Sequence, residues 1–281
     1  MTHPDDISLP RREFMSTMLA AGFALAVQPV MAQTTVHTDD AGLVVGEVKI
    51  PVQGGEMPAY FAQPAGAGPF ATVLVVQEIF GVHEYIRDVC RRLARLGYLA
   101  VAPELYARQG DPSRIKSVQD ILSGIVAKVS DEQVLSDLDA CVAWAAANSG
   151  DTTRLGITGF CWGGRITWLY AAKNPKLKAA VAWYGRLDGE PNERTPQHPM
   201  DLAAGITVPV LGLYGGQDQN IPVEDVEQMR SSLAKGGSHS LLHVYPDAPH
   251  AFHADYRPTY RRSAAEDGWQ RLTAWFKEHG M

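Results

Sequence analysis

The sequence predicts an α/β fold in which a mostly parallel β-sheet is covered by helices on both faces. Short apolar, β-branched runs alternate along the chain with longer amphipathic runs. Residues 71–77 (Ala-Thr-Val-Leu-Val-Val-Gln) are almost continuously apolar, as a strand buried on both faces should be. Residues 86–96 then show apolar side chains at helical spacing, followed by Gly97, a residue that commonly ends helices. This strand–helix alternation is typical of a parallel sheet.

The other elements are expected to follow the same alternation. Two segments of alternating polarity, 43–50 and 57–63, predict an opening β-hairpin. Further strands are predicted at 71–77, 98–102, 154–158, 178–183, 208–213 and 241–245, and helices at 86–96, 115–127, 134–147, 162–173, 224–235 and 260–278. No repeat or linker divides residues 33–281, so we expect a single domain there.

The composition excludes several classes of protein. The 281 residues are 46% hydrophobic and 20% charged, which is ordinary for a globular chain and argues against disorder or a fibrous repeat. A net charge of −6 gives no electrostatic reason to bind nucleic acid or anionic lipid. Three cysteines cannot form a disulfide scaffold in a chain of this length.

Residues 1–32 are expected to be a cleavable export signal. Arg11-Arg12 precede the apolar run 16–27, which is too short to span a bilayer comfortably, and small residues lead up to Ala32. The arginine pair resembles a twin-arginine signal, although a proline stands where serine or threonine is usual. We therefore expect export by the twin-arginine machinery, cleavage near Ala32, a bacterial periplasmic location and no stable membrane association afterwards. A buried N-terminal helix and a retained membrane anchor are the alternatives.

The strongest chemical signal is Gly159-Phe160-Cys161-Trp162-Gly163, between a predicted strand and a predicted helix. It matches the G-x-S-x-G nucleophile elbow with cysteine in place of serine. In this turn the residues two positions before and after the nucleophile must be small, and the helix N-terminus favours developing negative charge. Cys161 is therefore the candidate nucleophile, with a buried packing cysteine as the alternative.

Partners for this cysteine follow in the order nucleophile, acid, histidine that α/β-hydrolases use. Asp218 ends a predicted buried strand and could hold the tautomer of a histidine, and His250 could move protons from its loop before the last helix. Asp247 is the rival acid, and His239, His243 and His253 are the rival bases.

Glu78 stands at the end of the apolar run 71–77, where an unpaired carboxylate would be costly to bury. A surface glutamate is the alternative. This strand end should lie beside the nucleophile elbow, and the following loop would complete an oxyanion hole. The backbone N–H groups of Ile79 and Trp162 are the expected donors.

Five motifs together make the chain resemble the dienelactone hydrolase (carboxymethylenebutenolidase) family over about residues 43–280. They are Gln77-Glu78-Ile79-Phe80-Gly81, Pro103-Glu104-Leu105-Tyr106-Ala107-Arg108, Gly159-Phe160-Cys161-Trp162-Gly163-Gly164, Gly216-Gln217-Asp218 and His250-Ala251-Phe252-His253. The resemblance implies an α/β-hydrolase fold and a triad of Cys161, Asp218 and His250.

The resemblance also implies roles for two more side chains. Glu78 would take the thiol proton when substrate binds, and Arg108 would pair with a substrate carboxylate. The family's second arginine is expected four residues after the histidine, where this chain has Ala254. Whether Arg257, three residues further on, replaces it is left open, as is whether Glu78 or His250 first deprotonates Cys161.

The expected reaction is acyl transfer on a small lactone or ester, either neutral or anionic. Cys161 would form a thioester that a water activated by His250 hydrolyses, with Phe80 and Tyr106 as candidate apolar walls. We also expect a neutral resting thiol, with Glu78 rather than a standing cation beside it. No metal or cofactor is called for, because His250-x-x-His253 lacks a third ligand in register. The alternatives are a hydrolase of other esters or thioesters, a non-catalytic binding protein on a hydrolase scaffold and a redox-active thiol protein.

Overall fold

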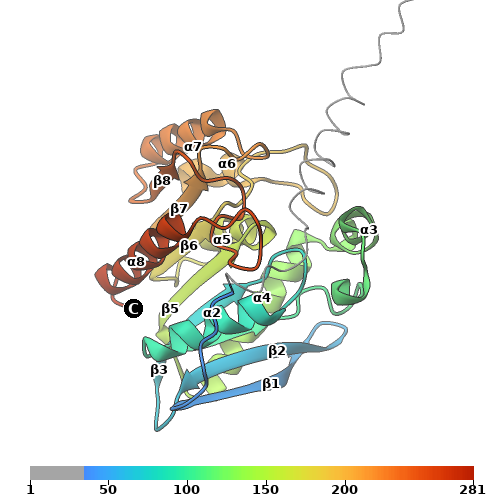
Figure 1. Cartoon of the computed structure of the whole chain (residues 1–281), viewed down its shortest axis with the longest axis vertical. Coiled ribbons are helices and arrows are strands. Elements are labelled where there is room, and N and C mark those ends of the chain that lie inside the picture. Colours follow the sequence, from blue (N-terminus) through green and yellow to red (C-terminus); the bar gives the residue numbers. More distant parts are fainter. Residues whose placement is uncertain (1–34) are drawn as a thin grey trace, which may run out of the picture.

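The computed structural model describes residues 35–281, which form an eight-stranded sheet flanked by helices (Figure 1). The predicted export signal, residues 1–32, lies outside the described residues. The strand order is β1-β2-β4-β3-β5-β6-β7-β8. β2 is antiparallel to β1 and β4, and all other neighbouring pairs are parallel. The predicted α/β fold with a mostly parallel sheet is confirmed.

The strands lie where the hydrophobic pattern predicts them, with ends that differ by a few residues. Their bounds are β1 (Leu43–Val52), β2 (Gly55–Pro64), β3 (Phe70–Val76), β4 (Leu99–Pro103), β5 (Gly150–Phe160), β6 (Ala179–Trp183), β7 (Val210–Gly215) and β8 (Leu241–Tyr245). β4 and β6 are buried along their whole length, because helices cover both faces of the sheet centre.

The helices lie between successive strands, except α8, which follows the last strand. Their bounds are α2 (Glu84–Arg95), α3 (Val118–Gly124), α4 (Asp131–Ala147), α5 (Trp162–Lys173), α6 (Pro199–Leu202), α7 (Val223–Lys235) and α8 (Arg262–Glu278). Right-handed crossovers place α2 on the face opposite to α4 and α5, because the chain reverses its direction across the sheet after β4. The guanidinium of Arg92 on α2 lies 5.8 Å from the ring of Trp269 on α8, so these two helices share a face (Figure 1).

Two helix predictions differ from the structure. In place of the predicted helix 115–127 the structure has α3 and a short 3₁₀ turn, Val126–Lys128, and another 3₁₀ turn, Pro112–Arg114, precedes them. Ser117 caps α3 by accepting a hydrogen bond from the N–H of Asp120, so the helix begins after residue 117. This segment packs into a small apolar cluster of its own with Ile79, apart from the main core.

The last helix begins at Arg262 rather than at residue 260, because Arg261 has an extended backbone. The chain between β8 and α8 is therefore a longer loop than the sequence predicts. No helix within residues 35–281 is both long and apolar enough to cross a bilayer.

Candidate active site

Cys161 occupies a strained turn between β5 and α5. Its backbone angles are φ 56° and ψ −113°, a conformation that costs energy for any residue with a side chain. The turn is held because the N–H of Cys161 donates to the carbonyl of Trp183 (3.0 Å) and the N–H of Gly164 donates to the carbonyl of Cys161 (3.0 Å). The cysteine is 6% exposed, so its sulfur lies at the edge of the core, at the carboxyl end of the sheet.

The two outer glycines of the motif are required by close backbone contacts. A Cβ at Gly163 would lie 2.5 Å from the carbonyl oxygens of Val76 and Gln77, and a Cβ at Gly159 would lie 2.3 Å from the carbonyl oxygen of Gly163. No side chain fits at such distances. The elbow is therefore packed directly against the end of β3, the strand that leads to Glu78.

Asp218 and His250 form the pair that their order in the sequence predicts. Asp218 follows β7, His250 follows β8, and Nδ1 of His250 lies 2.7 Å from Oδ2 of Asp218. Burial lowers the pKa of His250, but the carboxylate of Asp218 and the sulfur of Cys161 outweigh it and raise the pKa from 6.5 to about 10. The imidazole therefore interacts with the acid on one side and with the cysteine on the other.

The rival bases and the rival acid make other contacts. His253 is buried, and its Nδ1 lies 2.6 Å from the hydroxyl of Tyr85. His239 and His243 lie before and within β8, and Asp247 is exposed in the turn that follows it.

Glu78 is fully buried and held by three side chains. Its Oε2 accepts a hydrogen bond from the hydroxyl of Tyr256 (2.5 Å) and lies 3.3 Å from Nε2 of His83. Its Oε1 lies 3.5 Å from Nη2 of Arg257, which is 2% exposed. Nε of Arg257 also donates to the Tyr256 hydroxyl (3.0 Å), so each of Arg257, Tyr256 and Glu78 contacts the other two.

These partners keep Glu78 ionised. Burial alone would raise its pKa, but the charge of Arg257, followed by His83 and the Tyr256 hydroxyl, lowers the pKa from 4.5 to about 2. Glu78 in turn raises the pKa of Arg257 against the effect of burial, and the guanidinium also interacts electrostatically with Cys161. The loop after β8 therefore brings a cation to Glu78, and the neutral resting thiol of Cys161 stays a prediction.

The two predicted arginines have different surroundings. Arg257 lies at Glu78, whereas Ala254, at the family's expected arginine position, is fully buried. Arg108 donates from Nη1 to the carbonyl of Gln53 (3.0 Å) and forms an ion pair through Nη2 with Asp137 on α4. The structure thus brings Arg257 to Glu78 and ties Arg108 to the β1–β2 turn and α4.

The expected oxyanion donors lie on adjoining segments. Trp162 is the first residue of α5, where a backbone N–H has no acceptor within its own helix. Ile79 lies in the turn closed by the bridge between Glu78 and Gly81. The side chains of Ile79 and Trp162 pack into the same apolar cluster with α3, so the two segments are neighbours.

Phe80 and Tyr106, the predicted apolar walls of the substrate site, lie beside Arg257 and Trp162 respectively. The guanidinium of Arg257 lies over the ring of Phe80, 4.8 Å from its centroid. The ring of Tyr106 is fully buried, and its centroid lies 4.8 Å from that of Trp162.

His83 and Tyr256 were not among the site residues that the sequence predicts. Only their nearness to the Glu78 and His250 motifs could have suggested them, since neither belongs to a recognisable pattern.

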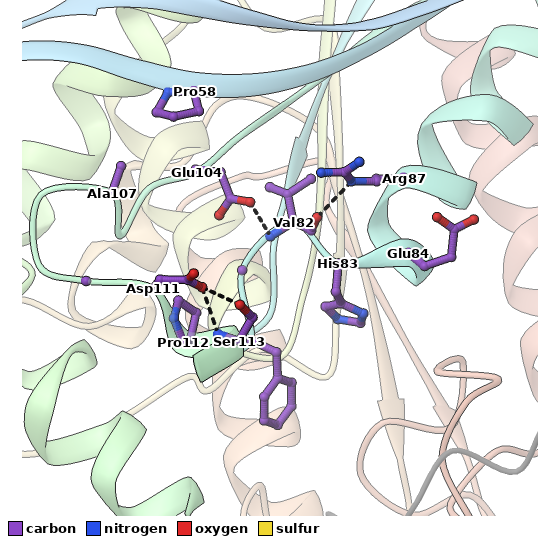
Figure 2. Close-up of a pocket in the computed structure, with 13 residues that line it drawn as sticks. Pro58, Val82, His83, Glu84, Arg87, Glu104, Ala107, Asp111, Pro112 and Ser113 are labelled. Atoms are coloured by element: carbon purple, nitrogen blue, oxygen red, sulfur yellow. Dashed lines mark hydrogen bonds between the residues drawn. The ribbon is translucent and has the colours of Figure 1, made fainter. Parts of the chain in front are cut away.

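A cavity of about 710 Å³ lies between the loops that follow β3 and β4 (Figure 2). Within it, the carboxylate of Glu104 accepts a hydrogen bond from the N–H of Val82 (3.2 Å), and Arg87 donates to the carbonyl of Val82 (3.2 Å). These bonds fix the loop that carries Glu78 and Ile79. His83 and Phe80 line the cavity, whereas Cys161 does not.

Residues 35–281 contain no group of three or more His, Cys, Asp or Glu side chains arranged to hold a metal ion. His250 and His253, the zinc-like pair of the sequence, contact Asp218 and Tyr85 respectively.

The sheet order, the strand-end elbow and the acid and histidine after the next strands define an α/β-hydrolase. Residues 57–280 match the model of the Dienelactone hydrolase family, and the chain belongs to this family.

Bacterial relatives cover nearly the whole chain. A Methylorubrum extorquens protein named "Putative carboxymethylenebutenolidase" is 62% identical over 275 residues, which are 98% of this chain and 94% of the relative. An Escherichia coli K12 protein of the same name is 58% identical over 95% of this chain and 98% of its own length.

Solved structures agree with this relationship. A crystal structure described as "Putative Dienelactone Hydrolase" from Klebsiella pneumoniae is 58% identical, with a TM-score of 0.82 over 84% of this chain and 98% of that one. Family and relatives together make the chain a hydrolase of the ester or lactone type.

Proposed function

We propose that the chain hydrolyses small lactones or esters by acyl transfer to Cys161, with His250 as the base and Asp218 as its orienting acid. The observation that carries this proposal is the 2.7 Å contact between Nδ1 of His250 and Oδ2 of Asp218, with Cys161 on the other side of the imidazole. A nucleophile, a base and a group that orients the base are the parts that covalent acyl transfer requires.

The reaction has two halves. With the proton of Cys161 held on His250, the thiolate sulfur attacks the substrate carbonyl. The N–H groups of Ile79 and Trp162 bind the oxyanion. The tetrahedral intermediate collapses to a thioester as the alkoxide leaving group takes the proton from His250; in a lactone, the leaving group stays attached. A water then gives its proton to His250 and attacks the thioester, which releases the acid and restores the thiol.

Glu78 can act as a base in this scheme only when it loses its partner Arg257. Its two oxygens face Arg257, Tyr256 and His83, and its pKa of about 2 makes it a weak base in this arrangement. His250 is therefore the first base as long as Glu78 keeps its partners. If an anionic substrate group draws Arg257 away, the pKa of Glu78 rises, and this carboxylate becomes a second acceptor for the thiol proton.

Arg257 is the proposed binding group for a substrate carboxylate. Its Nη1 and Nη2 atoms are buried, and neither has a hydrogen-bond partner among the described residues. A buried donor without a partner carries a free-energy cost that a carboxylate accepting two parallel hydrogen bonds would remove. Phe80 supports the guanidinium from below as an apolar platform.

Export remains a second part of the proposal. The arginine pair and the short apolar run before Ala32 support transport by the twin-arginine machinery into a bacterial periplasm. Cell fractionation of the full chain and of a variant with both arginines changed to lysine tests it. The wild type should reach the periplasm cleaved near Ala32, whereas the variant should stay in the cytoplasm uncleaved; equal export of both would contradict the proposal.

Turnover of p-nitrophenyl acetate and a dienelactone by wild type and Cys161→Ala tests the acyl-transfer mechanism. Cys161→Ala should lose activity, and mass spectrometry of quenched wild type should show an acetyl group on Cys161. Cys141→Ala, which changes a buried cysteine on α4, is the matched control and should keep both. Equal activity of wild type and Cys161→Ala would refute the mechanism, and no turnover by the wild type would favour a binding protein.

A further inference from the structure

His83 connects the buried carboxylate of Glu78 with the solvent. Its Nε2 lies 3.3 Å from Oε2 of Glu78, and its side chain is 26% exposed while that of Glu78 is completely buried. Figure 2 shows the imidazole in the cavity between the loops that follow β3 and β4. Because an ionised carboxylate only accepts hydrogen bonds, Nε2 of His83 carries a hydrogen in either charge state.

Two carboxylates and two phenols surround this imidazole. Glu78 faces it from the end of β3, and the charge of Glu104 interacts with it across the cavity. The ring of Tyr85 on α2 stacks against it at 5.9 Å, and the ring of Tyr256 meets it edge-on at 4.9 Å. Burial raises the pKa values of Tyr85 and Tyr256 well above 10, so both phenols are uncharged. The other charged side chains that line the cavity with His83 and Glu104 are Glu84, Arg87 and Asp111.

His83 and Arg257 share one carboxylate. Oε2 of Glu78 faces His83, and Oε1 of Glu78 faces Arg257. With His83 neutral, the charges of Glu78 and Arg257 cancel. With His83 protonated, the three side chains together carry one positive charge, because a single carboxylate cannot neutralise two cations. An anion at the Nη atoms of Arg257 then meets an environment with net positive charge.

We infer that His83 is a positioning residue that sets the affinity of Arg257 for a carboxylate group of the substrate by sharing Glu78 with it. This inference rests on the function proposed above, since it assumes that Arg257 binds the substrate anion. It makes the preference for anionic over neutral substrates depend on pH. Protonated His83 strengthens anion binding, and loss of its proton weakens it, while neutral substrates are unaffected.

Two p-nitrophenyl esters of equal length provide the kinetic test: the neutral hexanoate and the mono-ester of adipate, which ends in a carboxylate. For the wild type, KM for the adipate ester should rise about fivefold between about pH 5.5 and about pH 8, the range in which histidine ordinarily titrates. KM for the hexanoate ester should stay constant. His83→Gln keeps an N–H donor near Glu78 but does not titrate, so its KM for the adipate ester should lose this pH dependence. His239→Gln, at an exposed loop position, is the matched control and should behave as the wild type.

A binding measurement separates this inference from the acyl-transfer mechanism. Calorimetric titration with hexanoate anion, which cannot be hydrolysed, should show the same pH-dependent loss of affinity in wild type and not in His83→Gln. If the Kd of hexanoate depends on pH equally in both proteins, or in neither, the role of His83 is refuted. Cys161→Ala in the ester assay tests the mechanism independently, because the binding measurement does not require turnover.

Discussion

The ion pair between Glu78 and Arg257 should contribute a large, measurable part of the folding stability. Glu78→Gln keeps the shape of the side chain and an acceptor for the Tyr256 hydroxyl but removes the charge. The guanidinium of Arg257, 2% exposed, is then buried without its counter-ion. Breaking a buried pair in this way is strongly destabilising because it leaves an uncompensated charge in the interior.

The size of the effect follows from the pKa of Glu78. Its value falls from 4.5 to about 2 in the folded chain. Because one pKa unit corresponds to about 1.4 kcal/mol, ionised Glu78 stabilises the folded state by about 3 kcal/mol. This agrees with the range of about 3–5 kcal/mol for removing one partner of a buried pair.

Urea denaturation at about pH 7 of wild type, Glu78→Gln, Arg257→Met and the double variant measures the pair directly. Each single variant should lose about 3 kcal/mol of unfolding free energy. The double variant should be less destabilised than the sum of the two, because no charge remains unpaired. Strictly additive single effects would refute the argument, since they would mean that the two charges do not stabilise each other.

The same pair predicts how stability depends on pH. The folded-state pKa of Glu78 lies below its unfolded value, so its contribution is fully present above about pH 4.5 and is lost as the pH falls towards about 2. The stability difference between wild type and Glu78→Gln should therefore shrink over this interval. A constant difference from neutral to strongly acidic pH would show that Glu78 does not carry this linkage.

Three further substitutions test other parts of the site. Asp218→Asn should lower kcat/KM by about 10³- to 10⁴-fold without unfolding the chain, because His250 loses the carboxylate at its Nδ1. Ester turnover measures the loss and circular dichroism checks the fold, and near-normal turnover would contradict the expectation. Gly163→Ala should lower Tm by about 6 °C or more, because its Cβ would lie 2.5 Å from two carbonyl oxygens, whereas Gly205→Ala, with nothing within 4 Å, should change Tm little. Arg108→Gln should leave KM for the adipate ester within about twofold of the wild-type value, because its guanidinium is bound to Asp137 and the Gln53 carbonyl rather than to the site; a KM raised only for the anionic ester would assign Arg108 to substrate binding.

The nucleophile turn could be predicted because its determinants are local. The glycines at 159 and 163, the preceding apolar strand and the following helix are contiguous in the sequence, and α5 begins and ends at the predicted residues. Asp218 and His250 are distant in sequence from Cys161, yet their places after β7 and β8 put them at the same edge of the sheet. Parallel strands present their carboxyl ends together, so chain order was enough.

The surroundings of Glu78 could not be predicted in this way. Its hydrogen bond to Tyr256 joins residues 178 positions apart, and it depends on how the loop between β8 and α8 folds over the end of β3. The sequence predicts the last helix from residue 260 and so leaves Arg257 in the loop before it, but it does not show that this loop brings the guanidinium to the carboxylate. No periodic pattern encodes such a loop.

For Arg108, the sequence motif suggested a contact that the structure does not show. Its motif suggested a substrate contact, but the side chain has a buried carboxylate, Asp137 of α4, as a competing partner. Which partner a long, flexible side chain takes depends on distances between elements that the sequence does not contain.

The sequence by itself determined the α/β architecture, the strained cysteine turn and the order of acid and histidine, because each follows from hydrophobic period, steric limits or the direction of parallel strands. The tertiary structure decided which charges meet around Glu78. Arg257, Tyr256 and His83 reach the carboxylate from two loops, whereas Arg108 pairs with Asp137. The physical reason is that electrostatic pairing requires contact within a few ångströms in a buried space, and only the packed fold sets those distances.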